Sequence, residues 1–287
     1  FMSVGAFSGI VVSQSLAGLI PNGPVRLALS MFIGALLAAL VGLLIGTPVL
    51  RLQGDYLAIV TLAFGEIIKE LINCLIIGCD ENGLHFIFNP AGNKTVDDLG
   101  LSASGTAIIK GAQGATGTAT IATFTAGFIL VMITLIVVLN LTRSRAGRAI
   151  MAIRDNRIAA ESVGINITKF KLMAFTISAA IAGAGGVLYA HNLSTVTATP
   201  ANFGYNMSIM ILVFVVLGGM GNFRGSIIAA VLLTLLPEVL RGLSDYRMLI
   251  YSIVLIVMML FNWAPKCIEW RQKMAQKFRK NTKKEAV

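Results

Sequence analysis

Residues 143–171 read RSRAGRAIMAIRDNRIAAESVGINITKFK and form the only long polar segment between two apolar blocks in the second half of the chain. Seven Lys or Arg side chains lie in it, against only Asp155 and Glu161. A connection this basic beside membrane helices is typical of the cytoplasmic side. Asp155 as N-cap and Gly164 as C′ residue predict about two turns of helix over residues 156–163. So short a helix is unstable alone in water and needs a partner surface.

The composition is that of an integral membrane protein. The 287 residues are 56% hydrophobic and 13% charged, whereas a soluble domain carries about 25% charged residues. The net charge of +10 would suit nucleic acid. The basic residues, however, gather in a few loops and in the tail, which anionic lipid headgroups and the positive-inside bias explain better. We therefore expect a lipid bilayer as partner and no nucleic acid.

Sequence motifs for metal binding and catalysis are missing from the chain. Its cysteines, Cys74, Cys79 and Cys267, form no CxxC pair, and His85 and His191 stand apart, so no metal site is predicted. There is no GxxxxGK[ST] motif for binding ATP, and no Ser/His/Asp or Cys/His set stands out. We therefore predict that the chain is not an enzyme.

Eight apolar segments approach the roughly 20 residues that a helix needs to cross a bilayer. They are residues 2–20, 27–45, 56–77, 121–141, 172–190, 207–217, 226–240 and 249–263. The sixth and seventh are short enough to form a re-entrant pair instead. If residue 1 lies in the cytoplasm and the spans alternate, most Lys and Arg fall on the inside, as the positive-inside bias requires.

The predicted fold class is therefore all-α: a polytopic transmembrane helical bundle of about eight spans, carrying a short cytoplasmic helix. The bundle occupies residues 1–265, and a basic cytoplasmic tail follows over residues 266–287. Residues 78–120 form a long exterior loop rich in Gly, Thr and Asn. Loops of this length are usually functional or disordered, so a contact with another protein and a passive loop both stay open.

The third predicted span contains charged residues, which cost about 2.5–3.5 kcal/mol near the bilayer centre. Glu66 and Lys69 are i, i+3 neighbours and can pair, with Glu70 close by. The group is either a structural ion pair between helices or a polar lining of a translocation path. Asp55, before Tyr56, is either a simple N-cap or a contact for a substrate ammonium group.

Two sets of glycines have a predicted packing role. Gly218, Gly219 and Gly221 interrupt the apolar run between spans six and seven, where they allow a broken helix or a close helix approach. They do not complete GxGxxG, and no predicted strand precedes them, so a dinucleotide site is not predicted. The glycines of the fifth span, Gly183, Gly185 and Gly186, predict a thin face for tight packing.

Three runs carry a resemblance to a known family. They are RLQGDYLAIVTLAFGEIIKEL at 51–71, GRAIMAIRDNRIAAESVGINITKFKLMAF at 147–175 and VVLGGMGNFRGS at 215–226. Each resembles permease subunits of branched-chain amino acid ABC transporters, of the LivM type. The resemblance covers nearly the whole chain.

The resemblance implies a multi-pass permease of the inner (cytoplasmic) membrane that imports branched-chain amino acids by alternating access. The implied partners are a second related permease, two cytosolic ATPases and an extracytoplasmic amino-acid-binding protein. ATP is bound by the ATPases, so this chain has no cofactor. The loop at 143–171 becomes a coupling segment that docks on an ATPase, through Asp155, Arg157, Ala159, Ala160, Glu161 and Gly164. The candidate translocation-path residues are Asp55, Tyr56, Thr61 and Glu66.

Two alternatives stay open, an ion-coupled secondary amino acid carrier and the same importer class with urea or another small amide as substrate. The sequence also departs from the family pattern. An insertion follows GCDENG at residues 78–83, and no basic n-region precedes the first apolar run at Phe1. Because family members carry further spans before this point, we expect one or two helices to precede residue 1.

Overall fold

The computed structural model describes most of the chain up to residue 239. The described ranges are 1–18, 20–52, 54–80, 83–90, 92–100, 105–219 and 223–239, with single residues at 221, 249, 252, 253 and 256. The chain divides into two compact units, Phe1–Tyr205 and Asn206–Val287. The eighth predicted span, at 249–263, lies almost wholly outside the described residues, and the predicted tail lies entirely outside them.

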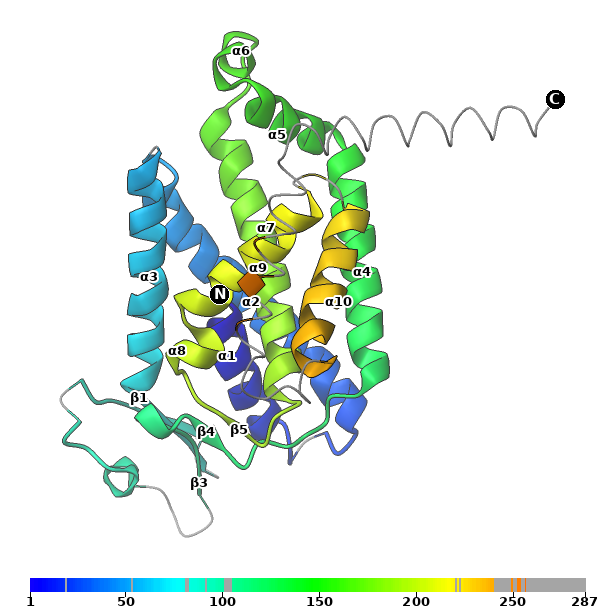
Figure 1. The fold of residues 1–287 in the computed structure, drawn as a ribbon. Helices are drawn as coiled ribbons and strands as arrows, with labels where there is room; N and C mark the ends of the chain where they lie inside the picture. The colour runs from blue at the N-terminus through cyan, green and yellow to red at the C-terminus, as the bar shows by residue number, and fades with distance from the viewer. Residues whose placement is uncertain are drawn as a thin grey trace. The chain divides into compact units, whose positions relative to one another are not determined.

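The described residues are mainly helical (Figure 1). The helices are α1 Met2–Ser15, α2 Gly23–Val49, α3 Asp55–Asn73, α4 Phe124–Arg143, α5 Arg145–Asp155, α6 Arg157–Ser162, α7 Ile167–Ala190, α8 Pro200–Phe203, α9 Tyr205–Gly218 and α10 Phe223–Val239. Among the described residues, α2, α4 and α7 are long and apolar enough to cross a membrane. A count of about eight spans is therefore not confirmed.

The centre of the first unit is a three-helix group formed by α1, α2 and α7. Glycines bring these helices into backbone contact. A Cβ added at Gly5 would collide with the backbone of Gly183, and one added at Gly186 would collide with the backbone of Met2. The predicted thin face of the fifth span is thus confirmed at Gly183 and Gly186. At Gly185 no described atom lies within 4 Å of an added Cβ.

A five-stranded antiparallel sheet is the main departure from the predicted all-α fold. Its strands are β1 Leu75–Asp80, β2 Gly83–Phe88, β3 Thr106–Lys110, β4 Ala115–Thr116 and β5 Thr195–Val196, in the order β2-β1-β3-β4-β5. The predicted exterior loop at 78–120 therefore contains β2, β3, β4 and the end of β1. The third predicted span also ends at Asn73 rather than at Ile77. The apolar residues after the helix belong to β1, which pairs with a neighbouring strand on each side.

The main core lies where this sheet meets the helices. Phe7 and Ile10 of α1 pack with Ile77 of β1, Ile109 of β3 and Val196 of β5. β5 follows α7 in the chain, so the sheet joins the segment after α3 to the segment after α7. Figure 1 shows the sheet at one end of the first unit and α5 with α6 at the other.

The glycine contacts lead to a prediction about α7. Replacing Gly186→Ala forces a methyl group against the Met2 backbone, so the free energy of unfolding should fall by about 1–3 kcal/mol, as in other overpacked interiors. Thermal unfolding of the purified chain in detergent measures the change. The matched control is the neighbouring Gly185→Ala, which should leave the unfolding temperature unchanged or raise it. Equal losses in both variants would contradict backbone contact at Gly186.

Candidate functional site

The segment that links α4 to α7 is built from three capped helices. The Ser144 hydroxyl accepts a hydrogen bond from the Gly147 N–H at 3.0 Å and begins α5. The Asn156 side-chain oxygen accepts one from the Ala159 N–H at 3.1 Å and begins α6. Asn166 caps α7 in the same way. Each cap satisfies a donor that the first turn of a helix leaves unpaired, so each helix start is fixed locally.

The predicted N-cap role of Asp155 is wrong, because Asp155 is the last residue of α5. Its carboxylate instead contacts the Arg154 guanidinium at 2.9 Å. The chain leaves the helical conformation one residue later, at Asn156, with φ −154° and ψ 108°. An N-cap requires this extended backbone conformation, so the amide of Asn156 takes the role.

Gly164 ends α6 in the left-handed conformation expected of a C′ residue, with φ +80°. Its N–H donates to the Glu161 carbonyl at 3.0 Å, and the Ile165 N–H donates to the Ala160 carbonyl at 3.1 Å. These two bonds together are the Schellman motif. A helix of only six residues is therefore closed at both ends by its own sequence.

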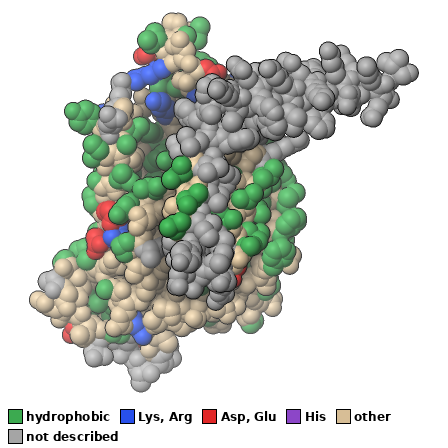
Figure 2. All heavy atoms as spheres, in the orientation of Figure 1, with side chains coloured by type: hydrophobic (Ala, Val, Ile, Leu, Met, Phe, Trp, Pro, Cys, Tyr) green, Lys and Arg blue, Asp and Glu red, His purple; other side chains and the backbone are tan. Residues whose placement is uncertain are grey.

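One side of α6 is anchored and the rest is exposed. Ala160 is buried in a small cluster with Ile153 of α5 and Ile167 of α7. Ile158 and Val163 are 81% and 74% exposed. Neither belongs to the predicted coupling set, whose exposed members are Asp155, Arg157, Ala159, Glu161 and Gly164. Figure 2 shows hydrophobic, basic and acidic side chains side by side at this projecting end. Such large exposed apolar side chains on a projecting helix favour contact with another protein.

The charged residues of α3 form an ion cluster around Lys69, whose side chain is buried. The Lys69 ammonium contacts the Glu66 carboxylate and lies 3.3 Å from the Glu70 carboxylate. Asn73, one turn further on, donates a hydrogen bond at 3.4 Å to the backbone carbonyl of Ala198. The cluster therefore lies in the last two turns of α3, beside the segment between β5 and α8.

The structure does not bring the four candidate path residues together. Tyr56, Thr61 and Glu66 are five residues apart, which turns each about 140° from the last around the helix. Tyr56 is 74% exposed, and the Thr61 hydroxyl donates to carbonyls of its own helix. The predicted N-cap role of Asp55 is wrong, because Gly54, with φ +60°, is the N-cap and Asp55 is the first helical residue.

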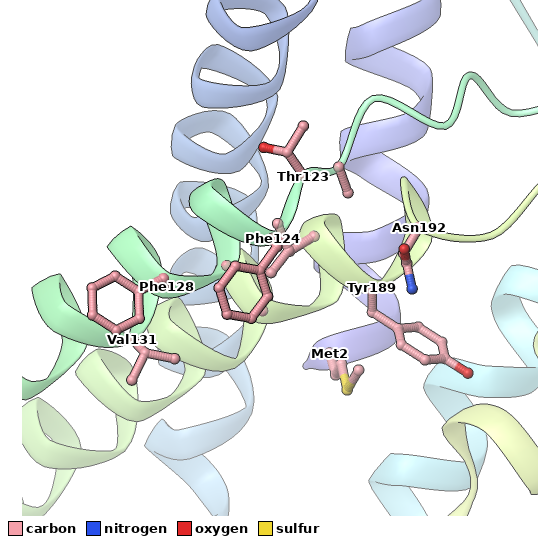
Figure 3. A pocket seen from close by; sticks show the side chains of 11 residues that line it. Met2, Thr123, Phe124, Phe128, Val131, Tyr189 and Asn192 are labelled. Carbon is pink, nitrogen blue, oxygen red and sulfur yellow. The ribbon is translucent and has the colours of Figure 1, made fainter.

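A cavity of about 730 Å³ lies between the start of α4, the end of α7 and Met2 (Figure 3). Phe124, Phe128 and Val131 line it from α4, and Tyr189 lines it from α7. None of the candidate path residues is among its lining residues. The sequence feature that could have indicated this cavity is the aromatic pair Phe124 and Phe128 at the start of α4, together with the small residue Gly185 on α7.

The glycines after α9 lie where that helix ends and α10 begins. A Cβ added at Gly218 would collide with the Ser226 backbone. Gly219 and Gly221 have φ +92° and +89°, a conformation that glycine adopts at no steric cost. Within the described residues, no group of three or more His, Cys, Asp or Glu could hold a metal ion.

The cap of α6 can be tested by replacing Asn156→Ala. Loss of a side-chain cap costs about 0.5–2 kcal/mol, and α6 has few other contacts to compensate. Amide hydrogen exchange at residues 159–162 should therefore become faster. Asn156→Asp keeps an acceptor and should restore slow exchange. Unchanged exchange in the alanine variant would show that tertiary contacts alone hold α6.

The ion cluster of α3 can be tested by replacing Lys69→Met. The change leaves two neighbouring carboxylates without their cation, so the free energy of unfolding should fall by about 1–3 kcal/mol, since both carboxylates are partly exposed. Thermal unfolding in detergent measures the loss. Lys94→Met, at an exposed position in the β2–β3 connection, is the control. A loss equal to that of the control would show that Lys69 does not stabilise α3.

Comparison with known proteins identifies the family. The family model described as "Branched-chain amino acid transport system / permease component" matches residues 1–262. The "High-affinity branched-chain amino acid transport system permease protein LivM" of Escherichia coli (strain K12) is 38% identical over 241 residues, which is 82% of this chain and 55% of LivM. The protein of the same name in Salmonella typhimurium (strain LT2) is 39% identical over 243 residues, with the same two shares.

More distant similarity extends to sugar import. The "Ribose import permease protein RbsC" of Escherichia coli (strain K12) is 30% identical over 124 residues, or 41% of this chain and 38% of RbsC. No solved structure gives a significant match. The chain spans about half the length of the LivM relatives that it matches. It is an integral membrane protein and belongs to the permease-component family of branched-chain amino acid transport systems.

Proposed function

We propose that this chain is a transmembrane permease subunit of a binding-protein-dependent ABC importer for branched-chain amino acids. The family match and the names of the LivM relatives support the substrate class and the importer class. The observation that carries the proposal is α6, a helix capped at both ends by its own sequence. It projects at the end of α4 and α7 (Figure 1), and the Ile158 and Val163 side chains are exposed.

In this proposal α6 is the coupling helix and docks in a groove on a cytosolic ATPase. Ile158 and Val163 fill the groove, because their exposed side chains gain most from burial. Arg157 and Glu161 supply polar contacts at the rim, and Ala160 holds the helix to α5 and α7. The docking segment also includes Asp155 before α6, Ala159 within it and Gly164 after its last turn.

The packing provides a route for motion from α6 into the bundle. The Schellman motif joins the end of α6 to Ile165 and so to the start of α7. α7 in turn packs along α1 and α2 through backbone contacts at Gly183 and Gly186. A displacement of α6 therefore moves α7 together with α1 and α2. We infer that ATP binding in the ATPase pair drives alternating access by this route.

The proposed assembly contains a second related permease, two ATPases and an extracytoplasmic amino-acid-binding protein. ATP is bound by the ATPases, so the permease needs no cofactor and performs no catalysis. In this proposal the helical bundle lies in the inner membrane of the cell. The cytoplasmic side holds the basic segment at 143–171 and the tail at 266–287. α3 forms one wall of the translocation path, and Asp55, Tyr56, Thr61 and Glu66 are its candidate residues, of which the last three point to different sides of the helix.

A single substitution tests the coupling role. Ile158→Asp places a charge in the proposed groove contact, and losing a central contact of this kind costs about 2 kcal/mol or more. We expect at least about a ten-fold weaker association with the ATPase subunits and a matching loss of uptake in proteoliposomes. Thr168→Asp adds the same charge at an exposed position of α7 and should leave both unchanged.

Two results would reject the proposal. Full uptake by the Ile158→Asp variant would show that α6 does not couple transport to an ATPase. Uptake that persists after removal of the ATPases would favour the ion-coupled carrier instead. Competition with urea and with leucine in the same vesicles identifies the substrate class within the importer.

A further inference from the structure

The edge strand β2 exposes a row of large apolar side chains. Leu84, Phe86 and Phe88 are 41%, 61% and 49% exposed. They alternate along the strand, so all three stand on one face of the sheet. Among the described strands, β2 is the outer strand of the sheet order and pairs with β1 alone. Three such side chains in a row form a patch that requires a partner.

The strand register shows which face carries this patch. Phe86 lies opposite Ile77 of β1, Phe88 opposite Leu75, and Leu84 opposite Cys79. Directly opposite residues share a face of an antiparallel sheet. Ile77 belongs to the core that the sheet forms with α1, and Leu75 and Cys79 pack against that core. The patch therefore lies on the same face of the sheet as the residues that pack on the helices. It extends that face beyond the helices.

The patch also lies at the level where the helices end. β1 begins two residues after the last residue of α3, and the Asn89 N–H donates to the Cys74 carbonyl at 2.8 Å. This bond ties the end of β2, next to Phe88, to the C-cap of α3. Phe124, the first residue of α4, is 89% exposed at the same end of the unit. Apolar and aromatic side chains at such a boundary are typical of the bilayer interface.

Charge argues for apolar insertion and against adsorption to anionic headgroups. Residues 75–116 hold four acidic and only two basic side chains. Anionic lipids attract basic segments and repel acidic ones. The rings and the leucine must therefore bind through burial of apolar surface, in neutral as well as in anionic lipid.

We propose that Leu84, Phe86 and Phe88 insert into the lipid interface of the bilayer beside α3 and anchor the sheet to the membrane surface. The excess of acidic side chains and the position at the helix ends make the lipid interface the occupant that fits this face. The inference depends on the chain being an integral membrane protein, not on its proposed transport activity.

A fluorescence measurement tests the insertion. The full chain, purified with its accompanying subunits, carries Phe86→Trp and is reconstituted in neutral phosphatidylcholine nanodiscs with or without bromine near the carboxyl end of the acyl chains. The matched control is Ile87→Trp, on the opposite face of the same strand. Trp263 and Trp270, the two tryptophans of the chain, are replaced by Phe in both variants. Thermal unfolding checks that each variant is folded.

We expect about a two-fold loss of emission from the residue 86 reporter in brominated lipid, as for a ring that lies about 5–10 Å inside the headgroup boundary. The residue 87 reporter should keep its emission, and added anionic lipid should change neither result. Red-shifted emission at position 86 with quenching by aqueous iodide would overturn the proposal. Blue-shifted emission that neither bromine nor iodide quenches would also overturn it and would indicate a protein partner on this face.

Discussion

The backbone contact between α7 and its neighbours α1 and α2 is the constraint on which the first unit depends. In lipid there is no hydrophobic force between helices, so association rests on close van der Waals packing. Gly183 and Gly186 allow that packing, because a Cβ at Gly183 would collide with the Ala38 side chain and one at Gly186 with the Met2 backbone. The three helices therefore form one rigid group, and the remaining elements are attached to it.

Both ends of α7 carry structure that depends on this rigid group. At its start, Asn166 caps the helix directly after the closed turn of α6. At its end, the chain continues into β5, which completes the sheet. α4 is different, because none of its residues is buried within the described part of the chain. The cavity between α4 and α7 lies along this sparsely packed helix.

Much of the segment at 143–171 could be predicted because its signals are local. Gly164 and a helix of about two turns follow from short-range chemistry, since an αL position favours glycine whatever surrounds it. The N-cap was assigned one residue too early. Asp and Asn are equally good caps, and the choice depends on where α5 stops, which its packing against α4 and α7 determines. The path residues of α3 stay a prediction, because helical rotation turns Tyr56, Thr61 and Glu66 to different sides of the helix.

The sequence by itself determined that this chain is a membrane protein of the permease family, that α2, α4 and α7 are long apolar helices, and that a short capped helix interrupts the basic segment. These properties depend on composition and on neighbouring residues. Only the tertiary structure decided that LIIGCD at 75–80 leaves α3 and becomes a strand. An apolar run of that length fits a helix or a strand equally well. The sheet that β1 joins continues through β3 and β4 to β5 at Thr195–Val196, so only the folded chain brings all of its strands together.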